Sequence, residues 1–150
     1  MLQRKQTLFL LFSLISVIVC LCLPVGKFVP DVMGENITIF NLWVSNDGCR
    51  DFSVWPLFAA LLISCPIEIY AIFAYHNRPL QSKMCLLGVL LVLVWYALYL
   101  VFVLYREVPN AHFVASFGVC LPLLSAIFLL MARQGINHDE KLVRSADRIR

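Results

Sequence analysis

The chain has 150 residues, of which 61% are hydrophobic and only 14% are charged, and its formal net charge is +3. Soluble domains carry about 25% charged residues, so this composition excludes an ordinary water-soluble fold. The weak positive charge gives no reason to expect a nucleic-acid partner. Four apolar stretches, at about residues 7–25, 54–75, 84–105 and 111–131, reach the length of about 20 residues that a helix needs to cross a bilayer. The sequence therefore predicts one all-α membrane domain over residues 1–150, built as a four-transmembrane-helix bundle.

The basic residues are distributed unevenly around the four stretches. Three of the 12, Lys27, Arg50 and Arg106, lie on the side that the chain reaches after the first stretch. The other nine lie on the opposite side: Arg4, Lys5, Arg78, Lys83, Arg133, Lys141, Arg144, Arg148 and Arg150. Short loops rich in Lys and Arg stay in the cytoplasm, so both termini are predicted to be cytoplasmic, with residues 26–53 as an outer loop and residues 132–150 as a cytoplasmic tail. A cleaved signal peptide is the alternative for the first stretch, but no small-x-small cleavage motif follows it.

The outer loop contains a stretch with strand character. Residues 36–44 are rich in β-branched and aromatic side chains, and turn signals containing Gly and Asn stand on both sides. This pattern predicts a short β-hairpin in which the stretch pairs with residues 27–32. Pro30 lacks an amide hydrogen, so we expect it at an edge or outside the ladder.

The cytoplasmic tail has a predicted structure of its own. The fourth stretch is expected to end at Gly135, because glycine after a basic residue is common at a helix exit. Asn137 can cap a new helix, in which Leu142, Ala146 and Ile149 would share one face. The sequence therefore predicts a short amphipathic cytoplasmic helix at the C-terminal end of the chain.

The basic tail has three open interpretations: a topology determinant, a clamp on anionic lipid worth about 1 kcal/mol per basic residue, or a helix that docks a protein. Acidic residues alternate with the basic ones over residues 139–148, which weakens the attraction to lipid and favours a shaped protein contact. The candidate docking residues, one of them in the turn before the third stretch, are Arg78, Lys141, Leu142, Arg144, Ser145, Asp147 and Arg148.

Glu68 is the strongest candidate for chemistry within the membrane. An ionised carboxylate in hydrocarbon costs a few kcal/mol even on lenient insertion scales, so Glu68 should face the bundle interior or carry a proton. Tyr75 follows two helical turns later and is the other member of the candidate polar site. The functional interpretation is a proton- or cation-coupled site, and the structural one is a carboxyl that stabilises helix packing through a hydrogen bond to tyrosine.

The cysteines and histidines do not assemble into a recognisable site. Cys20 and Cys22 lie near the end of the first stretch, as a membrane thiol oxidant would require, but two thiols in an apolar helix are poorly activated. Packing residues are the simpler interpretation. His76, His112 and His138 lie at stretch ends or in the tail, with no second ligand at metal spacing. The sequence predicts no catalytic residue, no metal site and no cofactor.

Three segments of the sequence carry a family resemblance: residues 1–8 at the start, residues 77–81 in the inner turn and residues 139–150 at the close. Together they resemble a domain-of-unknown-function family of small four-span inner-membrane proteins of Bacteroidota. The resemblance implies a multi-pass protein of a bacterial inner membrane. It implies no catalytic residue.

Two functions remain as hypotheses. The first is a non-enzymatic accessory or scaffold protein in the lipid bilayer, whose tail docks a membrane or cytoplasmic protein. The second is a small transporter or channel, a homo-oligomer, that uses Glu68 as its coupling carboxylate. A membrane thiol or lipid enzyme is a remote third, because no nucleophile and base can be paired.

Overall fold

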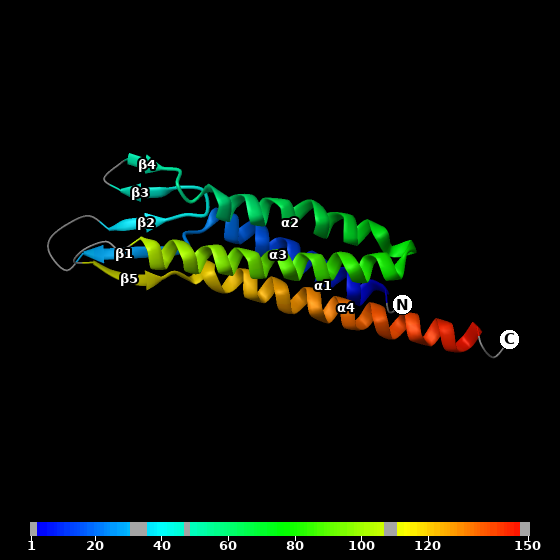
Figure 1. The fold of residues 1–150 in the computed structure, drawn as a ribbon. Helices are drawn as coiled ribbons and strands as arrows, with labels where there is room; N and C mark the ends of the chain where they lie inside the picture. The colour runs from blue at the N-terminus through cyan, green and yellow to red at the C-terminus, as the bar shows by residue number, and fades with distance from the viewer. Residues whose placement is uncertain (1–2, 31–35, 47–48, 107–110, 148–150) are drawn as a thin grey trace.

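The computed structural model describes residues 3–30, 36–46, 49–106 and 111–147. Its helices are α1 (Gln3–Cys22), α2 (Trp55–Phe73), α3 (Arg78–Tyr105) and α4 (Cys120–Asp147), with the 3-10 helices η1 (Ala74–His76) and η2 (Phe117–Val119). The strands are β1 (Gly26–Pro30), β2 (Ile37–Ile39), β3 (Val44–Asn46), β4 (Cys49–Asp51) and β5 (Ala111–Ala115). The helices lie side by side, and the strands extend from one end of the bundle, which we call the sheet end (Figure 1). At the opposite end, the turn end, α1 begins, η1 connects α2 to α3, and α4 ends.

The strands form one five-stranded antiparallel sheet in the order β4-β3-β2-β1-β5. The predicted all-α fold with a short hairpin is therefore wrong: the hairpin of β1 and β2 is only part of a larger sheet. The prediction missed β5, which pairs with β1 from Gly26 opposite Ala115 to Pro30 opposite Ala111. That pairing satisfies backbone groups at the start of the predicted fourth span, so the chain remains extended there.

Close backbone contacts fix the junction between the sheet and the bundle. A Cβ atom on Gly26 would lie 2.7 Å from the ring of Phe113 in β5, and one on Gly118 in η2 would lie 2.5 Å from the Pro24 carbonyl oxygen. Neither position has room for a larger side chain. The two glycines therefore let the end of α1, the sheet and the start of α4 approach one another.

Three helical segments are long and apolar enough to cross a membrane: Trp55–Phe73, Arg78–Tyr105 and Phe117–Val143. In the described part of α1 the apolar run, Gln6–Cys22, is shorter than these, because the chain leaves the helix after Cys22 and enters the sheet. The predicted set of four spans is therefore corrected to three candidates. Large apolar side chains on the outside of these helices are exposed, as expected for surfaces that face lipid: Leu90, Leu93, Leu100, Ile127 and Leu130 are examples. These features indicate a membrane protein.

The predicted end of a helix at Gly135 is also wrong. α4 runs without interruption from Cys120 to Asp147, so the tail is the continuation of one helix and Asn137 caps no second one. Gly135 serves packing instead, since a Cβ there would lie 3.2 Å from the Cγ atom of Gln6 on α1. Ile136, on the next position, is fully buried. Contacts with α1 therefore hold α4 helical through the glycine.

Candidate functional site

The candidate polar site within the bundle is a cluster of three side chains from three helices. Glu68 on α2 is only 1% exposed, and its Oε2 atom accepts a hydrogen bond of 2.8 Å from the hydroxyl of Ser13 on α1. The Ser13 hydroxyl also lies 2.8 Å from the hydroxyl of Ser125 on α4. Both serines are fully buried. We call Glu68, Ser13 and Ser125 the Glu68 cluster.

The hydrogen bonding of the Glu68 cluster is incomplete. The Oε1 atom of Glu68 is buried and has no hydrogen-bond partner among the described residues. On the α3 side, the carboxyl meets Gly88: a Cβ atom there would lie 4.0 Å from Cγ of Glu68 and 2.9 Å from a methyl carbon of Leu129. A buried polar atom without a partner costs about 1–3 kcal/mol, so this oxygen is an unusual feature of a packed helix interface.

Thiols and an arginine lie near the cluster. Cys65 on α2 and Cys85 on α3 are within electrostatic range of the Glu68 carboxyl, and Arg133 on α4 is within range of Cys85. The Nε atom of Arg133 is, like Glu68 Oε1, buried without a hydrogen-bond partner in the described part of the chain. This part of the bundle therefore combines a carboxyl, two thiols and a guanidinium.

The structure gives Glu68 a hydrogen-bond donor that the sequence analysis did not select. Tyr75 lies in η1 with 58% of its surface exposed, and the hydroxyl that donates to Glu68 belongs to Ser13. Ser13 and Ser125 were missed. Each is a single hydroxyl in an apolar stretch, and the signal available was its position on a helix that could face Glu68.

A second polar group ties the turn end together. The side-chain amide of Gln6 on α1 donates to the carboxylate of Asp139 on α4. Arg78 at the start of α3 donates to the backbone carbonyl of Asp139 at 3.4 Å. The Ser82 hydroxyl donates to the side-chain oxygen of Asn137 at 2.8 Å. These contacts anchor α4 to α1 and α3 at the level where it leaves the bundle.

The candidate docking residues fall into three groups. Arg78 is half-buried and belongs to the turn-end contacts. Lys141, Leu142 and Ser145 are exposed on α4, and the Ser145 hydroxyl donates to the Leu142 carbonyl at 2.8 Å. Arg144 and Asp147 lie on the same helix, but their side chains are outside the described ones, and Arg148 is outside the described residues.

At the sheet end, the fully buried Asn41 joins the loop to two helices. Its Nδ2 donates to the backbone carbonyl of Cys20 at 2.7 Å, and its Oδ1 accepts from the indole nitrogen of Trp95 at 3.0 Å. The thiol of Cys20 donates to the Gly118 carbonyl at 3.3 Å. Trp95 also stacks on Tyr99, whose hydroxyl donates to the Val25 carbonyl at 3.1 Å. The sequence analysis did not select Asn41.

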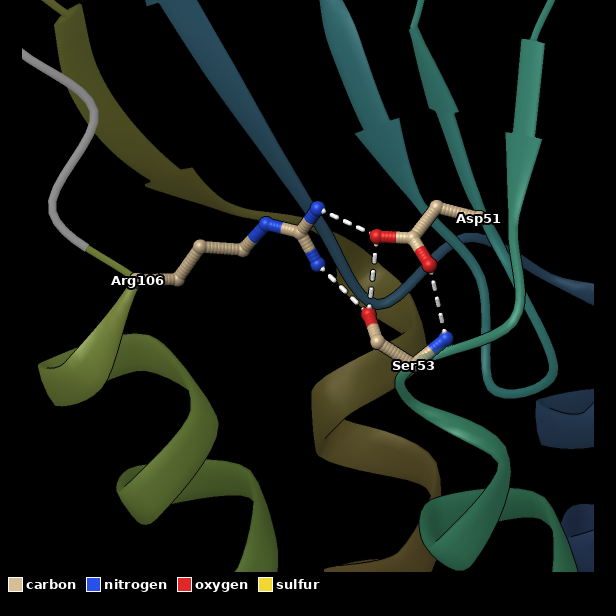
Figure 2. Close-up of polar contacts among 3 residues, drawn as sticks. All are labelled: Asp51, Ser53 and Arg106. Carbon is tan, nitrogen blue, oxygen red and sulfur yellow. Dashed lines mark hydrogen bonds and ion pairs between the residues drawn. The ribbon is translucent and has the colours of Figure 1, made fainter.

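A surface ion pair connects β4 with the end of α3. The Arg106 guanidinium lies 2.8 Å from a carboxylate oxygen of Asp51 and 2.9 Å from the Ser53 hydroxyl (Figure 2). Ser53 returns two hydrogen bonds of 3.0 Å to the same carboxylate, one from its amide and one from its hydroxyl. The pKa of Asp51 lies below its usual value. The hydrogen bond from the Arg106 guanidinium is the largest cause, and the hydrogen bonds from Ser53 come next.

The thiols form no disulfide and no metal-ligand group in the described residues. All six cysteines are free. Within residues 3–30, 36–46, 49–106 and 111–147 there is no group of three or more His, Cys, Asp or Glu side chains that could hold a metal ion. The candidates for a functional site are therefore the Glu68 cluster and the turn-end contacts.

Comparison with known proteins identifies the family without a function. No curated protein matches the chain. A family model described as a domain of unknown function, DUF4293, matches residues 2–149, which confirms the domain-of-unknown-function family expected from the two ends and the inner turn. Because the match covers nearly the whole chain, this protein belongs to the DUF4293 family.

Proposed function

We propose that this protein is a non-enzymatic membrane scaffold that docks a helical segment of a protein partner on the protruding end of α4. The turn end faces the cytoplasm of a bacterial inner membrane, because nine of the 12 basic residues belong to segments at that end or to the adjoining termini. The inner-membrane assignment rests on the resemblance of the chain's ends to Bacteroidota proteins.

One observation supports the proposal most strongly: the face of α4 that packs in the bundle continues past it. Ser125, Leu129, Ala132, Ile136 and Asp139 follow a spacing of four and three residues and are all buried. The next position in that spacing is Val143, which is 46% exposed, and Ala146 follows it in the sequence. A regular spacing of this kind is typical of a helix that packs against another helix.

The protruding segment, residues 141–147, is called the arm. It extends beyond the other helices of the bundle (Figure 1). Leu142, beside Val143, is 51% exposed. An unsupported apolar pair on a helix anchored at its base is suited to receive an apolar stripe from a partner helix. Lys141 and Arg144 flank the pair in the sequence, so the partner helix is expected to carry acidic residues beside its apolar stripe.

The position of the arm argues against lipid as its main contact. Lys83 is the last charged residue before the apolar run of α3, so we place the edge of the hydrocarbon there. Asn137 lies level with the adjacent Ser82, since their side chains are 2.8 Å apart. Leu142 is five residues further along α4, about 8 Å at 1.5 Å per residue. A headgroup layer is only about 5–8 Å deep, so a straight helix carries the apolar pair to its outer, aqueous edge.

Site-specific photo-crosslinking in native membranes tests the proposal. A photoreactive amino acid at position 142 should give one protein adduct of defined mass. The same probe at Gln134, exposed on the side of α4 opposite Val143, should give none. Adducts at both positions, or at neither, would contradict docking on this face. An adduct of twice the chain's mass would make the occupant a second copy and overturn a separate partner.

A matched pair of substitutions sharpens the test. With the probe at position 142, Val143→Glu should abolish the adduct, because it places a charge in the apolar face, whereas Gln134→Glu should leave it. Both variants keep the contacts of Asn137 and Asp139 with Ser82 and Gln6. Deleting the whole tail from position 137 would remove these contacts and is not a clean test. The transporter alternative rests on the Glu68 cluster alone, and Glu68→Gln should leave the adduct intact.

A further inference from the structure

The Glu68 cluster takes no part in the proposed docking. It is buried, and its hydrogen bonding is incomplete. Its three side chains come from α1, α2 and α4, and none is more than 1% exposed. They form a chain of two contacts, each 2.8 Å, from the Glu68 carboxyl through Ser13 to Ser125. The second carboxyl oxygen, Oε1, has no hydrogen-bond partner within residues 3–30, 36–46, 49–106 and 111–147. An ionised carboxylate in such a place would be short of hydrogen-bond donors.

The donor set is too small for a metal ion. Ca²⁺ and Mg²⁺ take about six or more oxygen ligands. The neighbouring buried hydroxyls are occupied elsewhere, since Ser64 donates to the Leu61 carbonyl at 2.7 Å and Ser16 to the Phe12 carbonyl at 2.9 Å. The cluster therefore offers one carboxyl and two hydroxyls, a set of groups that suits a proton.

We propose that the Glu68 cluster is a proton-binding site inside the membrane bundle. In the loaded state the proton resides on the Glu68 carboxyl, which donates to the Ser13 hydroxyl, and Ser13 donates to Ser125. When the proton leaves to water, the chain reverses: Ser125 donates to Ser13 and Ser13 donates to the carboxylate. No bond other than the carboxyl O–H is made or broken.

The depth of the site allows such an exchange. Gly88, against which Glu68 packs, is five residues beyond Lys83 on α3, so the carboxyl lies about 8 Å inside the charged edge of the bundle. Hydrocarbon is about 30 Å thick, so the carboxyl lies about halfway between the turn-end edge and the middle of the bilayer. The ionisable groups that face it are Cys65 on its own helix and Cys85 on α3, with Arg133 of α4 next to Cys85. From α1 the cluster receives the Ser13 hydroxyl.

Infrared spectroscopy of the full chain in lipid nanodiscs tests the proposal, because a protonated carboxyl has a carbonyl band that a carboxylate lacks. At neutral pH the native chain should show such a band, shifted on transfer to D2O and lost at high pH. Glu68→Gln should remove the band, while Glu140→Gln, at the turn end, should retain it. A native chain with no such band at neutral pH would overturn the proposal, as would a band that never responds to D2O or pH.

Two neighbouring serines provide a matched control for the hydroxyl chain. Ser13→Ala should shift the carbonyl band, since it removes the hydrogen bond to the carboxyl. Ser16→Ala removes a buried hydroxyl from the same helix, but that hydroxyl bonds only to its own backbone, so the band should stay in place. Equal shifts in both variants would show that the band reports general packing of α1 and would overturn the Ser13 connection. None of these results depends on the arm, so failure here leaves the docking proposal intact.

Discussion

Asn41 and Glu68 are both buried polar side chains at helix contacts, but they differ in how completely their hydrogen bonds are made. Asn41 donates to the Cys20 carbonyl and accepts from the Trp95 indole, so both ends of its amide are satisfied. Glu68 accepts one bond from Ser13 and leaves its other oxygen unpaired. Both residues contact more than one part of the chain, so connectivity alone does not distinguish them.

The difference indicates different roles. A neutral amide with every partner present holds the loop before β3 against α1 and α3, and nothing about it suggests exchange with a ligand. A buried carboxyl with one oxygen that lacks a hydrogen-bond donor contributes little to stability, because an apolar residue of similar size would pack without the desolvation cost. Asn41 therefore stabilises the fold, whereas the unpaired oxygen of Glu68 is better explained by the proposed proton site.

The largest effect on stability is expected from Asn41→Leu. The substitution leaves the buried indole N–H of Trp95 without an acceptor and removes the bond to the Cys20 carbonyl. Together these should lower the free energy of unfolding by about 2–4 kcal/mol. Equilibrium unfolding in detergent, followed by circular dichroism, measures it. In a double-mutant cycle with Trp95→Phe, the combined loss should be smaller than the sum, and simple additivity would argue against the bond.

Glu68→Leu should have the opposite sign. Ser13 and Ser125 can still bond to each other after the substitution, and the unpaired Oε1 atom disappears. The free energy of unfolding should stay the same or rise by up to about 2 kcal/mol, because a buried polar atom without a partner costs about 1–3 kcal/mol. The same unfolding experiment compares the two variants directly. A loss as large as that of Asn41→Leu would make Glu68 a structural residue.

The sequence predicted some of these features and not others, for physical reasons. The apolar spans at α2 and α3 follow from composition and length alone, and a carboxylate in the first of them is conspicuous. The sequence of β5 resembles the start of a membrane-spanning helix, because a short apolar run is compatible with a strand as well as with a helix. Its partner β1 lies far away in the chain, and no local pattern reports such a pairing.

Only the carboxyl of the candidate site could be predicted from the sequence, for a similar reason. Glu68 is rare in its setting, whereas Ser13 and Ser125 are ordinary small residues whose importance appears only once three helices meet. The continuation of α4 through Gly135 also depends on a tertiary contact, with Gln6. Local signals for a helix exit were present, and packing against α1 overrode them.

Asp139→Ala tests an intermediate case, the hydrogen bond from Gln6 to Asp139 at the turn end, which is more accessible to water than the Glu68 cluster. Removing the carboxylate leaves the Gln6 amide without its acceptor, which should cost about 1 kcal/mol, since water can reach part of the site. Amide hydrogen exchange should become faster in residues 141–147, because the base of the arm is loosened. His138→Ala, one position before and exposed, is the matched control and should have the smaller effect. If the two variants behave alike, the Gln6 contact does not anchor the arm.

The smallest effect is expected at the Asp51–Arg106 pair, whose side chains are 52% and 32% exposed (Figure 2). Arg106 lowers the pKa of Asp51 in the folded state, so the contribution to stability is present above the ordinary carboxyl pKa of about 4. It is lost as the pH falls through the lowered value, because the protonated carboxyl no longer attracts the guanidinium. The protection of β4 amides from hydrogen exchange, relative to an unstructured peptide at the same pH, should therefore decrease below about pH 4 in the native chain. In Arg106→Gln the protection should already be lower at neutral pH and should fall less on acidification. An equal response to acid in both chains would mean that other carboxyls hold this edge of the sheet.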